Sequence, residues 1–427
     1  MKKSFPHISR IEGELTLPGD KSISHRALIF SALAKGNSEI KNLLNSEDIN
    51  STMGCLQKLG VRIEMKDNLV LVEGVGRKGF KKPENVLNCG NSGTTVRLLS
   101  GVLAVQNFTS VITGDDSLSQ RPMQRIIDPL QKMGCIIKSK DGKLPLQFYP
   151  ADKIEAIDYN LPLPSAQIKG AVLLTAIHID DITIVIENNL HTRDHTERML
   201  NLPVEELGDT KIIRASSEFY PEPDEYYIPG DISTAAFFIV LTLLSKNSQL
   251  SIKNVSLNKT RTVFLDLLIK MGAEIKIKII DDSNSEPYGD IFVKSSDLKN
   301  IEIDPIIVPA IIDEIPILAI AGALAEGEFL ISGAEELRIK ESDRINSICS
   351  NLRAAGFSIA EFDDGFSIDG NINNDFNLFE GYGDHRIAMA LSILSCLMEK
   401  GSEVNGIESI NISSPYFLDQ LESIKVQ

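Results

Sequence analysis

Cationic and hydroxyl side chains cluster near the beginning of the chain, in the segment 19–26 (GDKSISHR). Lys21, Ser22 and Arg26 fall within about one to two turns if a helix starts there. Lysine supplies a point charge and arginine a planar fork, and both groups bind phosphate or carboxylate. The segment therefore predicts an anion site at a helix start. A capped helix with surface charges is the alternative interpretation, and a P-loop is a poor match because the glycine and lysine are not adjacent.

Two later segments combine the same kinds of group. In the segment 91–97 (NSGTTVR), Gly93 would let a ligand touch the backbone at a helix start. Arg121, which precedes a proline, could clamp an anion, and Ser165 and Gln167 add a hydroxyl and an amide. A turn followed by a helix is the alternative interpretation of each segment alone.

Carboxylates lie among cations in the second half of the chain. Asp313 precedes an apolar stretch, residues 337–344 read LRIKESDR, and residues 383–386 read GDHR. Carboxylates in such a setting can act as general acids or bases, while the cations stabilise anionic ligands. A salt-bridge network at a helix end is the alternative for each segment alone. Because the clusters fall at the predicted helix starts or adjoining loops of successive repeats, we favour a functional role over chance surface charge.

A pair of histidines could in principle share a metal ion. His191 and His195 are four residues apart, and Arg193 lies between them. The H-E-x-x-H pattern of zinc enzymes is absent, so we expect no metal.

An internal repeat organises these clusters. A polar cluster followed by an apolar helix, a short strand and a second helix recurs roughly every 65 to 80 residues. The helix starts are expected near Asp20, Asn91, Ser165, Asp231, Asp313 and Asp384. Six α/β units divide most naturally into three per domain, with a boundary in the stretch 221–225 (PEPDE).

The helices of each repeat carry distinct patterns. Second helices end in similar strings whose glycines, Gly60, Gly134 and Gly272, suit helix C-caps. First helices, such as residues 235–241 and 317–324, are apolar on nearly every face. We therefore expect them inside each domain, with sheets around them and their polar N-termini together at one end, where an anion can bind.

Composition limits the function classes. The 427 residues exceed the size of one hydrophobic core, so two domains are expected. A net charge of −16 argues against nucleic-acid or membrane partners. Five scattered cysteines indicate no disulfide framework, and neither a signal peptide nor a membrane span is expected. A cytoplasmic location fits these features.

From residue 19 to residue 417 the chain resembles the 3-phosphoshikimate 1-carboxyvinyltransferases, or EPSP synthases. The strongest matching strings are the segments 19–26, 337–344 and 383–386, and the strings SAQ and TRDHTE resemble the class II branch. The resemblance implies an α/β fold of two similar domains, each of three βαβαββ repeats, described as an inside-out α/β barrel. It also implies domains at 19–228 and at 1–18 plus 229–427, with two chain crossings forming a hinge, and domains that close over the substrates.

The resemblance implies a reaction as well. The enolpyruvyl group of phosphoenolpyruvate passes to the 5-hydroxyl of 3-phosphoshikimate and phosphate is released, on the way to chorismate and aromatic amino acids, without cofactor or metal. Separately, we expect a monomer. The residues implied to bind 3-phosphoshikimate are Lys21, Ser22, Arg26, Ser165, Gln167, Arg193, Asp313 and Lys340. Those implied to bind phosphoenolpyruvate are Lys21, Gly93, Arg121, Gln167, Arg344 and Arg386. The implied catalytic residues are Asp313, Glu341, Lys340, Lys21 and His385.

Two alternatives stay open at this point. The sister enzyme that uses UDP-N-acetylglucosamine typically has a cysteine or sometimes an aspartate in the loop before an Arg-Pro, and no cysteine occurs in residues 115–122. A non-catalytic protein that binds phosphorylated metabolites would need only the cations, whereas Asp313 and Glu341 are both present. One departure from some members is the lack of a lysine near Ile412.

Overall fold

A computed structural model describes residues 1–188, 192–282, 286–370, 373 and 375–426. The chain divides into two units, each with its own hydrophobic core: Gly19–Ile228, and Met1–Pro18 together with Pro229–Gln427. We call them the first and the second unit. The division after Ile228 differs from the boundary placed at 221–225, because β14 (Glu225–Tyr227) pairs with β3 (Lys35–Lys41) inside the first unit.

The first unit contains three successive repeats. The first consists of α1 (Lys21–Leu33), β3, α2 (Glu47–Lys58), β4 (Arg62–Lys66) and β5 (Leu69–Val75), and β14 completes its sheet. The second consists of β6 (Leu87–Asn88), α3 (Gly93–Leu103), β7 (Ser110–Thr113), α4 (Asp116–Gln120), α5 (Gln124–Lys132), β8 (Ile136–Lys140) and β9 (Lys143–Tyr149). The third consists of β10 (Asp158–Asn160), α6 (Ala166–Ala176), β11 (Thr183–Asn188), α7 (His195–Met199), β12 (Val204–Leu207) and β13 (Thr210–Ala215), followed by η1 (Ser217–Phe219).

The second unit repeats the pattern with more variation. The fourth repeat consists of β2 (Glu12–Thr16), α8 (Ile232–Leu244), β15 (Gln249–Ser256), α9 (Val263–Lys270), β16 (Glu274–Asp281) and β17 (Tyr288–Lys294). The fifth consists of η2 (Pro305–Ile307), α10 (Val308–Ile311), α11 (Ile315–Ala323), β18 (Phe329–Ile331), η3 (Glu335–Ile339), α12 (Arg344–Ala354), β19 (Ser358–Phe362) and β20 (Gly365–Asp369). The sixth consists of β21 (Leu378–Glu380), α13 (His385–Leu397), β22 (Ser402–Asn405), η4 (Ile407–Ile412) and α14 (Phe417–Ser423), and β1 (Lys2–Phe5) joins its sheet.

Sheet topology confirms the internal repeat. The orders β14-β3-β5-β4, β6-β7-β9-β8, β10-β11-β13-β12 and β2-β15-β17-β16 are equivalent. In each, the first pair is parallel and the remaining pairs are antiparallel. The fifth and sixth sheets have three strands each, in the orders β18-β20-β19 and β1-β22-β21.

The predicted helix signals are confirmed within one residue. Asp20, Ser92, Ser165, Asp231 and Asp384 each cap a first helix by accepting a backbone N–H, and Glu314 precedes α11. Gly60, Gly134 and Gly272 follow second helices with φ of 94°, 94° and 105°. That left-handed region suits glycine at a helix C-cap.

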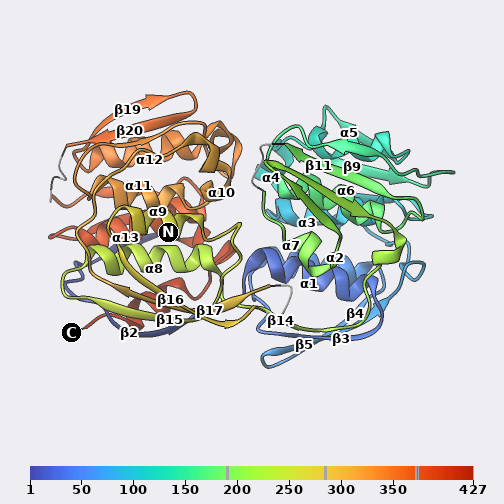
Figure 1. Ribbon diagram of the computed structural model, residues 1–427, viewed down its shortest axis with the longest axis horizontal. Helices are drawn as coiled ribbons and strands as arrows, with labels where there is room; N and C mark the ends of the chain where they lie inside the picture. Colours follow the sequence, from blue (N-terminus) through green and yellow to red (C-terminus); the bar gives the residue numbers. More distant parts are fainter. Residues whose placement is uncertain (189–191, 283–285, 371–372, 374, 427) are drawn as a thin grey trace. The chain divides into compact units, whose positions relative to one another are not determined.

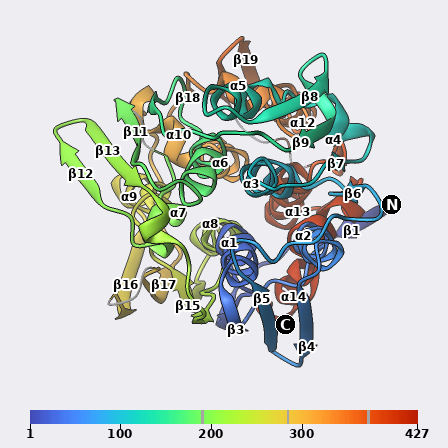
Figure 2. The same ribbon diagram turned by 90° about the vertical axis from the view of Figure 1, so that its right-hand side faces the viewer.

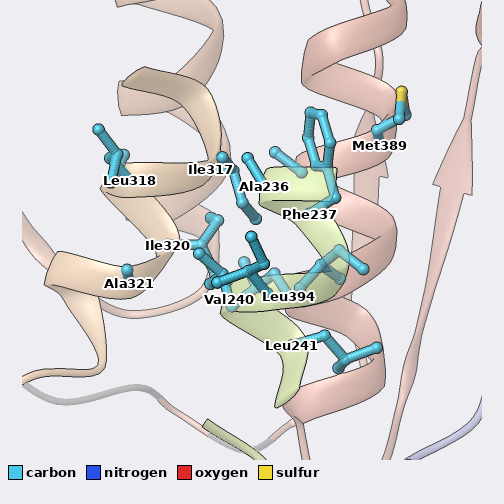
Figure 3. Packing of buried hydrophobic residues seen from close by; sticks show 14 of the residues in the cluster. Ala236, Phe237, Val240, Leu241, Ile317, Leu318, Ile320, Ala321, Met389 and Leu394 are labelled. Atoms are coloured by element: carbon cyan, nitrogen blue, oxygen red, sulfur yellow. The ribbon is translucent and has the colours of Figure 1, made fainter. Parts of the chain in front are cut away.

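Apolar helices form the interior of each unit. In the second unit, α8, α11 and α13 pack against one another, with Val240, Ile317 and Leu394 among the contacting side chains (Figure 3). In the first unit, sheets surround α1, α3 and α6 (Figure 1 and Figure 2). Each fully buried leucine or isoleucine contributes about 1.5–3 kcal/mol, which explains why these helices are apolar on all faces. The inside-out α/β barrel predicted from the resemblance is confirmed.

The apolar helices were compared with the length needed to span a membrane. Within the described residues, no single helix is long and apolar enough to cross a bilayer. The helices Pro305–Ile311 and Ile315–Ala323 reach that length and composition only together, as a pair bent by 117°.

Candidate active site

Lys21 is the first residue of α1, directly after the capping Asp20. Its ammonium nitrogen lies 3.0 Å from Oδ2 of Asp48 on α2. This ion pair fixes the lysine beside the N-terminus of α1, where the helix dipole favours an anionic ligand. Asp48 was not among the predicted site residues, because an acidic residue in the first turn is common in helices generally and does not by itself indicate a binding site.

Arg26 lies further along α1 and is only 3% exposed. Its Nε donates to the Thr196 hydroxyl on α7 at 2.8 Å, and its Nη1 donates to the carbonyl oxygen of Ser22 at 2.9 Å. These bonds hold α7 against the start of α1. Arg193 is half-buried and lies two residues before α7, beside the buried Thr192.

Gln167 links the starts of α6 and α3. Its Oε1 accepts from Nη1 of Arg97 at 2.5 Å, and its Nε2 donates to the Thr94 hydroxyl at 3.0 Å. Ser165 caps α6 by accepting the N–H of Ile168 at 3.4 Å. Arg97 was not among the predicted site residues, although its position four residues after Gly93 was a usable signal.

Gly93 begins α3 and faces two guanidinium groups. A Cβ at this residue would lie 2.8 Å from Nη1 of Arg97 and 3.4 Å from Nη1 of Arg121. The other guanidinium nitrogen of Arg121, Nη2, donates to Oδ1 of Asn91 at 2.8 Å. Two cations and the free amides of a helix start together form a favourable place for an anion.

A chain of hydroxyl groups connects α1 to α3. Nδ1 of His25 lies 2.7 Å from the Thr52 hydroxyl, which lies 2.7 Å from that of Thr95, and Thr95 donates to Oγ of Ser92 at 2.7 Å. Burial, assisted by Lys21, lowers the pKa of His25 well below its usual 6.5. The imidazole is therefore neutral near pH 7. The predicted convergence of helix N-termini is thus confirmed inside the first unit.

Arg344 is the centre of the polar cluster in the second unit. It is 1% exposed, and its Nε donates to Oδ2 of Asp384 at 2.8 Å. Its Nη2 donates to Oε2 of Glu341 at 2.5 Å, and its Nη1 donates to Oδ1 of Asp313 at 3.3 Å. Burial opposes the charge, but the carboxylates raise the pKa of Arg344 above its usual value, with Asp384 contributing most. Arg344 is therefore a permanently charged group shared by several carboxylates.

Arg386 adds a second guanidinium at the start of α13. Its Nη1 donates to the carbonyl oxygen of Asp313 at 2.9 Å, and its Nη2 lies 3.8 Å from Oδ2 of the same residue. His385 is the first residue of α13 and is buried. Asp313 thus lies between the two predicted anion-binding arginines of this unit.

Lys340 precedes Glu341 and is half-buried. Burial lowers the pKa of Lys340; Asp313 opposes this shift, and Arg344 adds to it. A lysine beside a fixed guanidinium holds its proton less tightly than a surface lysine does.

A further buried network lies beside this cluster and was not predicted. Nη2 of Arg261 donates to the Ser233 hydroxyl at 2.6 Å, and that hydroxyl donates to Oε1 of Glu314. The same carboxylate oxygen lies 3.9 Å from Nη1 of Arg386. The starts of α8, α11 and α13 are therefore joined by polar contacts, as the sequence predicted for each domain. Arg261 gave no signal because it stands outside the repeated helix-start clusters.

Each unit brings together its own share of the predicted residues. The first unit holds Lys21, Ser22, Arg26, Gly93, Arg121, Ser165, Gln167 and Arg193, and the second holds Asp313, Lys340, Glu341, Arg344, His385 and Arg386. His191 lies outside the described residues. In the part of the chain that the structure describes, no group of three His, Cys, Asp or Glu side chains is arranged to hold a metal ion.

Comparison with known proteins identifies the family. Residues 6–421 match the sequence model of "EPSP synthase (3-phosphoshikimate 1-carboxyvinyltransferase)". The chain belongs to the EPSP synthase family. Membership confirms the predicted enzyme class, a transferase of the shikimate pathway, and favours it over the UDP-N-acetylglucosamine alternative.

Individual relatives support the assignment of this chain to the EPSP synthase family. The 3-phosphoshikimate 1-carboxyvinyltransferase of Petrotoga mobilis is 48% identical over 432 residues, with full coverage of both chains. That of Bacillus subtilis is 42% identical, covering 98% of each chain.

Solved structures give the same fold. EPSP synthase from Acinetobacter baumannii is 36% identical with a TM-score of 0.86, covering 100% of this chain and 98% of that one. The enolpyruvyl transferase NikO from Streptomyces tendae, at 15% identity and a TM-score of 0.75, covers 99% of this chain and 96% of that one. This second likeness shows the fold alone.

Proposed function

We propose that this chain transfers the enolpyruvyl group of phosphoenolpyruvate to the 5-hydroxyl of 3-phosphoshikimate and releases phosphate, through the residues described above. The observation that carries the assignment of roles is the contact of Arg344 with both Asp313 and Glu341. Two carboxylates on one guanidinium provide a proton acceptor and a proton donor beside a cation that can bind an anionic substrate.

The phosphate and ring of 3-phosphoshikimate bind residues of the first unit in this proposal. Lys21, Ser22 and Arg26 surround the phosphate and ring hydroxyls at the start of α1, which is favourable because the helix dipole and two cations act on one dianion. The remaining contacts are assigned to Ser165, Gln167 and Arg193, and the contacts around the 5-hydroxyl to Asp313 and Lys340.

Phosphoenolpyruvate binds the guanidinium-rich positions. Gly93 and Arg121 hold its phosphate at the start of α3, with Lys21 and Gln167 adjoining. Arg344 and Arg386 bind its carboxylate, because a guanidinium matches a carboxylate with two parallel hydrogen bonds.

The chemistry is an addition followed by an elimination. Asp313 accepts the proton of the 5-hydroxyl as its oxygen bonds to C2 of phosphoenolpyruvate, while Glu341 donates a proton to C3. The tetrahedral intermediate then loses a proton from C3, which Glu341 takes back, and phosphate from C2, which leaves with the proton that Asp313 had accepted. Lys340 stabilises the negative charge, and His385 is a secondary proton carrier. No oxidation state changes overall, so positioning and electrostatics suffice.

Domain organisation, location and partners complete the proposal. We assign the two units to two domains, with the chain crossings after Pro18 and Ile228 as a hinge. The five cysteines are all free and buried, which suits a reducing cytoplasm. The net charge of −16 would repel nucleic acids and anionic membranes, so we assign only small-molecule substrates as partners. The same charge disfavours self-association, and we propose a monomer.

Phosphate release by the purified chain tests the proposal. We expect turnover with phosphoenolpyruvate and 3-phosphoshikimate and none with UDP-N-acetylglucosamine as the acceptor. Glu341→Gln and Asp313→Ala should each lower kcat by orders of magnitude while 3-phosphoshikimate still binds.

The matched control is Glu328→Gln, an exposed position of the second unit, which should keep full turnover. Wild-type kcat in Glu341→Gln or Asp313→Ala would refute the assigned roles. Binding of both substrates without phosphate release would instead support the non-catalytic alternative.

A further inference from the structure

Three charged side chains are buried together in the first unit, away from any predicted role. Lys169 on α6 is 1% exposed, and its ammonium nitrogen lies 2.9 Å from Oε1 of Glu187 on β11. It also donates to Oε1 of Glu197 on α7, which is 4% exposed. We call Lys169, Glu187 and Glu197 the buried ion triad.

The triad holds both sides of the segment that contains Arg193. On one side, the Thr192 hydroxyl donates to Oε1 of Glu187, the oxygen that also pairs with Lys169. On the other side, Glu197 lies in α7, which begins two residues after Arg193. The backbone that carries Arg193 is therefore attached at two points to the side chain of one α6 lysine.

The triad also reaches Arg26. Thr196, the neighbour of Glu197, accepts the hydrogen bond from Nε of Arg26. Gly170, the neighbour of Lys169, packs close to this contact, because a Cβ there would lie 2.8 Å from Cδ2 of Leu98 and 3.3 Å from Oγ1 of Thr196. The position of the Arg26 guanidinium thus depends on how α7 is held against α6.

A contribution to stability does not by itself explain why charged residues occupy these buried positions. Charges removed from water are expensive, and apolar side chains of similar volume often stabilise a core as well or better. Burial raises the pKa of Glu197, and the neighbouring Lys169 opposes that shift. Unlike apolar packing, an ion triad makes directional contacts, and these contacts fix α6, β11 and α7 relative to one another.

We infer that Lys169, Glu187 and Glu197 are positioning residues, which hold Arg26 and Arg193 in place for the phosphate group of 3-phosphoshikimate. The inference rests on the proposed assignment of those two arginines. The triad itself does not contact substrate; it acts through Thr192, Thr196 and α7.

Steady-state kinetics of Glu197→Gln test the inference. The amide keeps the volume and one hydrogen bond to Lys169 but removes the charge that fixes α7. We expect KM for 3-phosphoshikimate to rise about tenfold, as for other residues that orient a binding group. KM for phosphoenolpyruvate and kcat should stay close to the wild-type values. An unchanged KM for 3-phosphoshikimate would overturn the inference.

A double-mutant cycle separates positioning from general destabilisation. If Glu197 acts through Arg26, Arg26→Met with Glu197→Gln should raise KM for 3-phosphoshikimate no further than Arg26→Met alone. Multiplicative effects would overturn the link to Arg26. The control Val72→Ala removes buried volume from β5 of the same unit, and it should lower the thermal midpoint without changing either KM.

The same series distinguishes failure of the inference from failure of the proposed function. If Arg26→Met does not change KM for 3-phosphoshikimate, the assignment of Arg26 is wrong, and the inference falls with it. If Arg26→Met raises KM but Glu197→Gln does not, the assignment stands and only the inference is overturned.

Discussion

Arg344 holds Glu341 in an ion pair of 2.5 Å between Nη2 and Oε2, and the same nitrogen lies 3.2 Å from Oδ1 of Asp384. One guanidinium nitrogen therefore serves a carboxylate of proposed catalytic function and a carboxylate that caps α13. Under the proposed assignment, an anionic substrate that binds Arg344 would compete with Glu341 for this guanidinium.

Replacement of Arg344 by methionine should destabilise the protein strongly. Removing one partner of a buried ion pair leaves uncompensated charge, here on the fully buried Asp384, and we expect a loss of about 3–5 kcal/mol in the free energy of unfolding. Denaturant titration measures this loss. The control Arg353→Met breaks a pair whose arginine is 42% exposed and should change stability by less than about 1 kcal/mol. Equal losses in the two variants would contradict this account.

Gly93→Ala should weaken phosphoenolpyruvate binding. The new methyl group would lie 2.8 Å from Nη1 of Arg97, so this guanidinium must shift and its hydrogen bond to Gln167 is disturbed. Overpacking of about 1–3 kcal/mol corresponds to an increase in KM of about 5- to 150-fold. The control is Gly54→Ala on α2, where no described group lies within 4 Å of the added Cβ, so KM should not change. A wild-type KM in Gly93→Ala would show that the arginines do not confine this position.

His25 should make stability depend on pH on the acidic side. Its pKa in the folded state is lowered well below 6.5, so the unfolded chain binds more protons between the two values. The stabilisation is fully present above pH 6.5 and is lost as the pH falls toward the lowered pKa, by at most about 1.4 kcal/mol per pH unit. Unfolding midpoints measured from pH 7 to 4.5 should fall less steeply in His25→Gln. The exposed His7→Gln should keep the wild-type slope; identical slopes in all three proteins would exclude the role of His25.

Lys340 should produce an alkaline limb in the pH profile of kcat. Burial lowers its pKa below the usual 10.5, and in the proposed mechanism the charged form, present below that pKa, is the one that stabilises the intermediate. We therefore expect kcat to decrease as the pH rises through the lowered pKa. Lys340→Arg keeps its charge at any accessible pH, so this limb should disappear even if kcat is reduced. A limb centred at or above 10.5 in the wild-type enzyme, or one that persists in the variant, would contradict the proposed role.

Sequence alone determined the repeat, the helix ends and the family. Caps such as Asp20 and Ser165, and the C-cap Gly60, act through hydrogen bonds to residues only a few positions away, so local sequence contains all the information they need. Helices that are apolar on every face have only one stable location, which is the interior. The predicted anion-binding clusters follow from the same local rules, because each lies at a helix start.

Only the tertiary structure decided which partners hold those clusters. Lys21 pairs with Asp48, Gln167 with Arg97, and Lys169 with Glu197, across sequence separations that no local pattern encodes. Buried charges need partners wherever the packing of helices places them, and that packing depends on side-chain shape along the whole of each unit. The sequence therefore revealed the groups that can meet a substrate, while the groups that hold them in position became visible only in the folded chain.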